Sequence, residues 1–162
     1  MVREIPLTRG KVALVDDDDF DLVSTFKWCA SQDRRTWYAQ SVHRVNGRRV
    51  HVRLHRIVLG VNDRSQQVDH VNGNGLDCRR CNLRIATSAQ NAMNRKTRVD
   101  SKSGMKGVKQ SHGCLNRWTA HIKRDGRHIH VGSFSTPEDA ARAYDQVARR
   151  LFGEFARTNY GS

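Results

Sequence analysis

The chain has 162 residues, a length that allows one ordinary domain or two small ones and excludes a large multi-lobed enzyme. Lysine and arginine number 29 against 16 aspartates and glutamates, and a net charge of +13 on so short a chain favours a polyanionic partner, nucleic acid above all. No apolar stretch reaches the roughly 18 residues of a membrane span, and the start of the chain lacks the apolar core of a signal peptide. We therefore expect a cytoplasmic protein without membrane contact.

The N-terminal region is expected to form a strand and then a helix. KVALV at residues 11–15 predicts a short strand, and the four aspartates that follow predict a solvated turn and a helix N-terminus over residues 16–26. Consecutive side chains diverge on either a strand or a helix, so these aspartates are not expected to hold a metal ion.

Residues 36–55 predict a β-hairpin, because Asn46-Gly47 favours a tight two-residue turn between alternating segments. One face of the hairpin is expected to carry Val42, Val50, Val52 and Leu54. The other face carries Arg49, His51 and Arg53, which point either to solvent or to DNA phosphates. The pattern leaves these two readings open.

A linker is expected at residues 96–104, and a second unit follows it. Alternation over residues 117–124 places Trp118, Ala120 and Ile122 on one face of a strand, and Asp125-Gly126 turns the chain. In the return strand we expect inward side chains at Ile129 and Val131 and outward ones at His128 and His130.

A helix is expected after this hairpin, because Thr136, Pro137 and Asp139 supply an N-cap, a first-turn proline and a third-position acid. Its apolar stripe consists of Ala140, Tyr144, Val147, Ala148, Leu151 and Phe152. The second unit is therefore predicted to be a three-stranded antiparallel sheet packed on one helix.

The residue types that carry chemistry gather in residues 68–95. A strand end delivers Asp69-His70, a glycine-rich loop follows, Asn82 opens a second strand, and Thr87 or Ser88 caps a helix with Asn91. Hydrolysis of a phosphodiester needs a base for water and hard oxygen ligands for a cation such as Mg²⁺. His70 can act as the base, and Asp69 and the Asn91 carbonyl can act as the ligands.

This segment resembles the HNH endonucleases, whose ββα-metal finger carries Asp-His, an Asn twelve residues later and a third His or Asn nine residues further. The chain has His70, Asn82 and Asn91 at that spacing, and Leu54-His55-Arg56 resembles the short segment that often precedes the finger. The residues between His70 and Asn91 resemble the version found in phage and intron-associated homing nucleases. The resemblance implies a metal bound by Asp69 and Asn91 and a catalytic pair of His70 as general base and Asn82 as a brace. The metal would be Mg²⁺ or Mn²⁺.

Several basic residues around the finger are expected to contact phosphates, namely Arg79, Arg80 and Arg84, with Arg49 and Arg53 of the hairpin as further candidates. Cys78 and Cys81 have the spacing of zinc ligands, but a structural zinc site needs four ligands and only one such pair is present. We expect reduced thiols and no structural Zn²⁺, with a metal pair as the alternative.

Residues 103–160 resemble the DNA-binding domain of the plant Apetala and ethylene-response factors. The matching residues include Lys106-Gly107-Val108, Trp118, Gly126, Gly132, Tyr144-Asp145 and Asn159. In that family the exposed face of the sheet lies in the major groove. The resemblance implies DNA contacts from Lys106, Lys109, Lys123, His128 and His130, with Arg117 and Arg127 as basic neighbours.

The expected fold class is α+β, with an N-terminal region at 1–53, a ββα-metal finger at 54–98 and the second DNA-binding unit at 103–160. The expected function is metal-dependent HNH cleavage of double-stranded DNA that leaves 5′-phosphate and 3′-hydroxyl ends, by a monomer or a homodimer. The resemblance suggests a phage or mobile-element protein in a bacterial host, such as a homing endonuclease. The alternative function is a non-catalytic, sequence-specific DNA-binding regulator.

Overall fold

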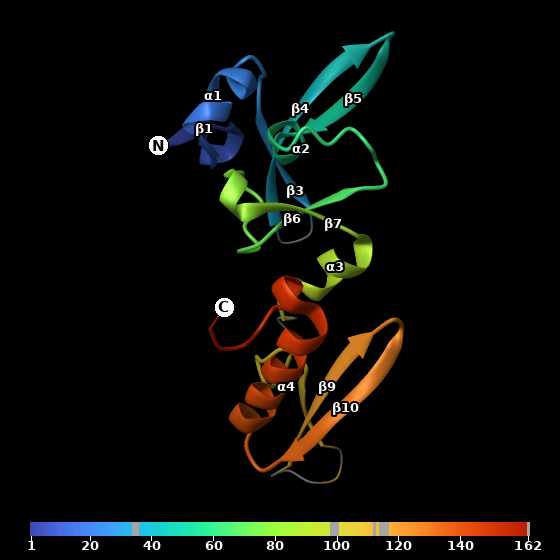
Figure 1. Cartoon of the computed structure of the whole chain (residues 1–162). Coiled ribbons are helices and arrows are strands. Elements are labelled where there is room, and N and C mark those ends of the chain that lie inside the picture. The colour runs from blue at the N-terminus through green and yellow to red at the C-terminus, as the bar shows by residue number, and fades with distance from the viewer. Residues whose placement is uncertain (34–35, 98–100, 112, 114–116, 162) are drawn as a thin grey trace. The chain divides into compact units, whose positions relative to one another are not determined.

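The computed structural model describes residues 1–33, 36–97, 101–111, 113 and 117–161. The chain divides into two compact units, residues 1–88 and residues 89–162. Both units combine antiparallel β-structure with helices (Figure 1), in agreement with the expected α+β class. The three domain ranges predicted from the sequence, 1–53, 54–98 and 103–160, remain predictions.

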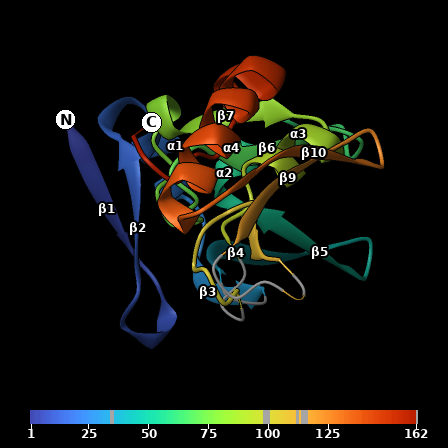
Figure 2. The ribbon, with the colours of Figure 1, turned by 90° about the horizontal axis from the view of Figure 1, so that it is seen from below.

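The first unit contains three small sheets, formed by β1 and β2, by β3, β4 and β5, and by β6 and β7. The β1–β2 pair forms a long twisted ribbon, seen clearly in Figure 2. The elements in chain order are β1 (Val2–Pro6), η1 (Thr8–Gly10), β2 (Val12–Asp16), α1 (Asp17–Ser24), β3 (Cys29–Asp33), β4 (Thr36–Val45), β5 (Arg48–Arg53), α2 (Leu54–Val58), β6 (Gln67–His70), η2 (Arg80–Asn82) and β7 (Leu83–Ala86).

The core of the first unit is small and joins elements from its whole length. Val15 of β2, Val23 of α1 and Leu54 of α2 are completely buried and belong to one apolar cluster. The segment that resembles the HNH finger therefore shares its core with the N-terminal strands.

Two of the four aspartates hold a distant arginine, so the expectation of a fully solvated turn is wrong for them. Asp19 is buried and binds the Arg80 guanidinium through both carboxylate oxygens, at 2.7 and 2.9 Å. The Asp16 carboxylate accepts the backbone N–H of Arg80 at 2.7 Å. The acidic run begins helix α1 as predicted, and it also fixes the loop before β7.

The hairpin of β4 and β5 has the predicted turn, because Asn46 and Gly47 both adopt positive φ angles, 48° and 75°. In this register Val42 lies opposite His51, whereas Val50 lies opposite His43. Directly opposed residues share a face, so Val42 lies on the basic face and not with Val50 and Val52. The predicted face of Val42 was wrong because a two-residue turn pairs an even position with an odd one.

The second unit holds the three-stranded sheet, in the order β10-β9-β8, and a helix α4 alongside it (Figure 1). Asp125 and Gly126 form the predicted turn, with φ angles of 49° and 79°. The elements are β8 (Val108–Gln110), β9 (Trp118–Arg124), β10 (Arg127–Phe134), α4 (Pro137–Phe152) and η3 (Gly153–Phe155), and α3 (Ser88–Met93) begins at the boundary between the units.

Helix α4 begins where the sequence predicts, since the Thr136 hydroxyl accepts the backbone N–H of Asp139. Its apolar side chains bury against Val108, Ala120 and Ile122 of the sheet. Ile129 lies opposite Ile122 but is 40% exposed, because β10 is the edge strand of the sheet. None of the described helices is long and apolar enough to cross a membrane.

Candidate functional site

Asn82 closes the loop that joins β6 to β7. Its side-chain amide donates to the Asp77 carbonyl at 2.7 Å, and its side-chain oxygen accepts the Asn72 backbone N–H at 2.9 Å. Its backbone carbonyl accepts the N–H of Val71 at 2.9 Å. Because Asn82 is buried, these bonds act without competition from water and hold the residues that follow His70 in one shape.

The same loop is pinned to β2. The backbone N–H of Leu14 donates to Leu76 and that of Cys78 donates to Leu14, both at 2.8 Å. Gly75 lies so close to β4 that an added Cβ would approach the Trp37 carbonyl to 2.5 Å and the Tyr38 ring to 2.6 Å. The loop therefore requires glycine at this point.

His70 ends β6 and is buried. Burial, which disfavours the charged imidazolium, lowers its pKa to about 4, although the carboxylates of Asp69 and Asp77 act in the opposite direction. The imidazole is therefore neutral near pH 7 and able to accept a proton. The rings of His55 and Tyr38 lie 4.9 and 5.9 Å from it, centroid to centroid.

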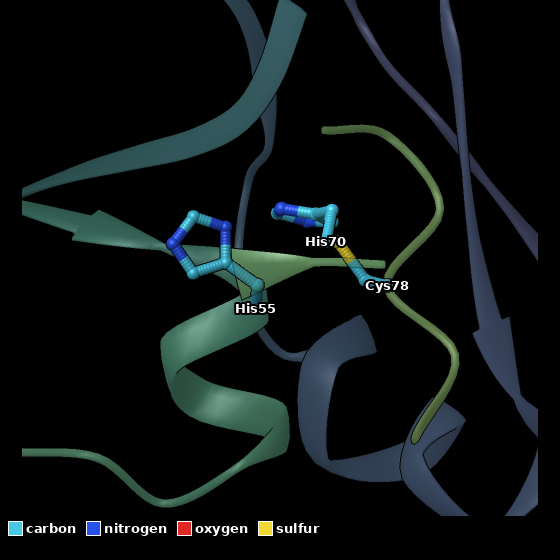
Figure 3. Close-up of side chains that lie close together, drawn as sticks. All are labelled: His55, His70 and Cys78. Atoms are coloured by element: carbon cyan, nitrogen blue, oxygen red, sulfur yellow. The ribbon is translucent and has the colours of Figure 1, made fainter. Parts of the chain in front are cut away.

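His55, at the start of α2, is the residue of this site that the sequence reasoning did not assign. Its ring meets the His70 ring at an interplanar angle of 85°, and burial lowers its pKa to about 3. Potential ligand atoms of His55, His70 and Cys78 all lie within 4.8 Å of one another (Figure 3). The Leu54-His55-Arg56 segment could have drawn attention to His55 in the sequence. The proximity of His55 to Cys78 depends on the tertiary fold and could not be predicted from that segment.

Three arginines expected at DNA phosphates each bind an aspartate. Two of the Arg84 side-chain nitrogens, Nε and Nη2, donate to Oδ2 of Asp69, at 2.9 and 2.7 Å, and this pair is largely buried. Arg79 binds Asp77 through two bonds of 2.7 Å, and these bonds lower the pKa of the Asp77 carboxyl. Arg80 binds Asp19. These guanidinium groups contribute to the shape of the loop.

Asp69 lies in β6, directly opposite Arg84 of β7. Asn91, expected to be the second metal ligand, is half-buried in α3 and belongs to the second compact unit. A carboxylate and an amide carbonyl are the hard oxygen donors that Mg²⁺ prefers, so the chemistry of these two residues fits a divalent cation of that kind.

Cys78 and Cys81 differ in their exposure to solvent. Cys78 is completely buried, while Cys81 is exposed and lies outside the His55 cluster. Cys29, Cys78 and Cys81 are free thiols, in line with the expectation of reduced cysteines, and Cys114 lies outside the described residues. Burial raises the pKa of the Cys78 thiol to about 12.

The basic face of the β4–β5 hairpin adjoins the histidines. Tyr38 shares its strand face with Arg44 and, across the ladder, with Arg49 and Arg53. The Arg53 guanidinium lies 4.6 Å from the centre of the Tyr38 ring, and that ring contacts both His55 and His70. Arg49 and Arg53 therefore lie on the strand face of the tyrosine that contacts both histidines.

The sheet of the second unit presents a basic face on the side away from α4. The register places Lys123 opposite His128 and His121 opposite His130, with Lys109 on the neighbouring strand. Burial and the positive charges of its neighbours lower the pKa of His121. Within the described residues, none of these five side chains forms an ion pair with a carboxylate.

Three further residues of this unit, Lys106, Arg117 and Arg127, are predicted to contact DNA. The Lys106 ammonium donates to the Met93 carbonyl, and its burial lowers its pKa to about 8. Arg127 lies opposite Arg124, on the face of Ile122 and Ile129. Arg117 is exposed just before β9.

A buried histidine at the end of a strand, next to an aspartate and before a loop that an asparagine closes, defines a candidate hydrolytic centre. An uncharacterized HNH endonuclease of Acanthamoeba polyphaga mimivirus is 30% identical over 156 residues, 93% of this chain and 76% of that protein. Protein 3.8 of Escherichia phage T7 is 30% identical over 109 residues, 67% of this chain and 88% of that protein. The chain belongs to the HNH endonuclease family.

A second likeness is shorter. An ethylene-responsive transcription factor of Arabidopsis thaliana is 56% identical over 46 residues, which are 27% of this chain and 18% of that protein. No family model matches the chain.

Proposed function

We propose that this protein is a metal-dependent endonuclease that hydrolyses phosphodiester bonds in double-stranded DNA. The observation that carries the proposal is His70, a buried neutral imidazole next to Asp69 in the Asn82-closed loop of a chain from the HNH family. A base in this state can take a proton from water at neutral pH.

Asp69 and Asn91 would hold Mg²⁺ or Mn²⁺, which when bound stabilises negative charge on phosphate oxygens. Arg84 holds the Asp69 carboxylate in a fixed position, and Asn82 does the same for the loop beside His70. His70 would accept the proton of the water that attacks phosphorus. The leaving oxygen is then the 3′ oxygen, so the products carry 5′-phosphate and 3′-hydroxyl ends.

Two surfaces are suited to hold the DNA. The basic face of β4 and β5 leads from Arg49 to Tyr38, which touches the ring of His70. The β9–β10 face, with Lys123, His128 and His130, would contact bases and phosphates, a role supported by the likeness to the ethylene-responsive factor.

One catalytic site cuts one strand, so a monomer nicks and a homodimer, or two successive events, breaks both strands. Relatives in a phage and a virus support an origin in a phage or mobile element, where homing is one use for such an enzyme in the host cytoplasm.

The test is incubation of supercoiled plasmid with the protein and Mg²⁺ or Mn²⁺, with and without chelator. Relaxed or linear plasmid should appear only with metal. Asp69→Ala and Asn91→Ala should raise the metal concentration that half-maximal nicking requires. Asp63→Ala is the matched control, because Asp63 is an exposed acid whose carboxylate, among the described residues, accepts bonds from Ser65 of its own turn. DNA binding without cleavage under every metal would leave the regulator as the function.

A further inference from the structure

The cluster of His55, His70 and Cys78 has a donor chemistry different from that of the proposed magnesium ligands. His55 comes from α2, His70 from the end of β6 and Cys78 from the loop before η2, and Figure 3 shows the three side chains gathered in one place. All three residues are more than nine-tenths buried. Two imidazole nitrogens and one thiol sulfur form a set that suits zinc and disfavours magnesium.

The spacing is close to what a metal ion needs. Zinc bonds of about 2.1 Å to nitrogen and 2.3 Å to sulfur place the ligand atoms of a tetrahedral site roughly 3.3 to 3.8 Å apart. The candidate atoms here already lie within 4.8 Å of one another. Side-chain rotations that move each candidate ligand atom by about 1 Å would bring these atoms to the separations of a zinc site.

The polar atoms of the cluster also point to a ligand. Nδ1 of His55 is buried and has no hydrogen-bond partner within the described part of the chain. A buried polar nitrogen without a partner is costly, and a bound cation would satisfy it once the ring turns toward the ion. The Cys78 backbone is fixed by its bond to Leu14, so the sulfur stays near the two rings.

We propose that His55, His70 and Cys78 form a second metal site, selective for zinc and other thiolate-binding cations. On binding, the Cys78 S–H bond gives way to a sulfur–metal bond and the proton passes to solvent. Three protein ligands leave one position for water. The following consequence rests on the proposed function. A metal ion in this site occupies the His70 lone pair that catalysis needs, so zinc inhibits the cleavage that magnesium supports.

Cobalt titration of the reduced, metal-free full-length protein tests the site without any nuclease assay. Bound Co²⁺ should produce a sulfur-to-cobalt charge-transfer band and the strong visible bands of tetrahedral cobalt, and Zn²⁺ should remove both. Cys78→Ser should lose the charge-transfer band and bind about ten-fold more weakly or worse. Cys81→Ser is the matched control, because this exposed thiol lies outside the cluster, and it should keep the whole spectrum.

Absence of the charge-transfer band from the unmodified protein, its persistence in Cys78→Ser, or its loss in Cys81→Ser would overturn the site. Thermal unfolding without metal verifies that Cys78→Ser is folded. If Cys78→Ser does not fold, His55→Gln replaces it as the test variant, because it should also weaken cobalt binding. In plasmid nicking with Mg²⁺, Cys78→Ser should need about ten-fold more Zn²⁺ for half inhibition. A chain that binds cobalt as expected but never cuts would refute the proposed nuclease and leave the metal site standing.

Discussion

The two units of this chain use positive charge in different ways. Residues 1–88 contain 15 basic and 10 acidic side chains, and residues 89–162 contain 14 and 6. In the first unit Arg79, Arg80 and Arg84 each bind an aspartate. In the second unit Lys109, Lys123 and three histidines share one sheet face without acidic partners among the described residues.

This difference shows that net charge alone does not locate a DNA surface. A guanidinium that donates to a buried carboxylate has already satisfied part of its hydrogen-bonding capacity, and its loss damages the fold. An exposed ammonium with no partner costs the fold little to remove and is available to phosphate. Variants of the two units should therefore separate stability from affinity.

The largest effect is expected from His70→Ala. Without its base the protein should still bind DNA, but its rate of nicking should fall by a factor on the order of 10² to 10⁴. Single-turnover nicking and equilibrium binding to the same duplex measure the two properties. His43→Ala is the matched control, because His43 lies on the opposite face of the hairpin from Tyr38. A nicking rate within a few-fold of the unmodified protein would refute the role of His70.

Arg80→Ala tests whether a paired arginine of the first unit stabilises the fold. It leaves the buried Asp19 carboxylate without its partner, which should lower the free energy of unfolding of the first unit by about 1 to 3 kcal/mol. Chemical denaturation followed by tryptophan fluorescence measures this loss. Lys123→Ala, which removes an exposed basic side chain, should change stability by less than about 0.5 kcal/mol. Equal losses in the two variants would contradict the distinction.

The buried histidines should make the first unit sensitive to acid. Their folded-state pKa values of about 3 and about 4 lie below the ordinary 6.5, so the unfolded chain binds protons first as the pH falls. The stability they provide is complete above pH 6.5. It is lost from pH 6.5 down to about 4 for His70 and about 3 for His55, by up to about 1.4 kcal/mol per pH unit for each histidine. Denaturation of metal-free protein between pH 7 and 4.5 measures the slope, which His55→Gln should reduce by about half. An unchanged slope would contradict this origin.

The smallest effects are expected on the sheet of the second unit. Lys123→Ala should reduce the slope of log K against log salt by about 0.9, the value for one lost phosphate contact on duplex DNA. If Lys123 and His130 read base edges, each alanine variant should also relax the preferred cleavage site, by about 1 to 3 kcal/mol of discrimination. Sequencing of the ends cut from a randomised library measures this preference. Relaxed preference in Arg84→Ala alone would move base recognition to the first unit.

The sequence was sufficient for features that depend on a few neighbouring residues. The turns at Asn46-Gly47 and Asp125-Gly126 and the start of α4 at Thr136 were predicted correctly because each depends on local backbone geometry. The spacing of His70 and Asn82 identified a loop that the structure shows closed by Asn82.

Features that join distant segments could not be predicted in this way. His55 and Cys78 are 23 positions apart and meet only because α2 and the loop pack on the same core. The bond between Asp19 and Arg80 spans 61 positions and gave no signal in either motif. The face of Val42, in contrast, follows from the two-residue turn and was within reach of the sequence.

The attachment of the loop to β2 and α1 has a consequence for protein engineering. Bonds from Leu14 and the carboxylates of Asp16 and Asp19 fix residues 76–80, so a graft of residues 54–95 into another scaffold would leave its loop without these anchors. The part of the motif that contains His55 and His70 could be transferred to another scaffold only together with β1, β2 and α1. A chimaera that replaces residues 1–53 of this chain should therefore lose the rigidity of the loop, even when every motif residue is retained.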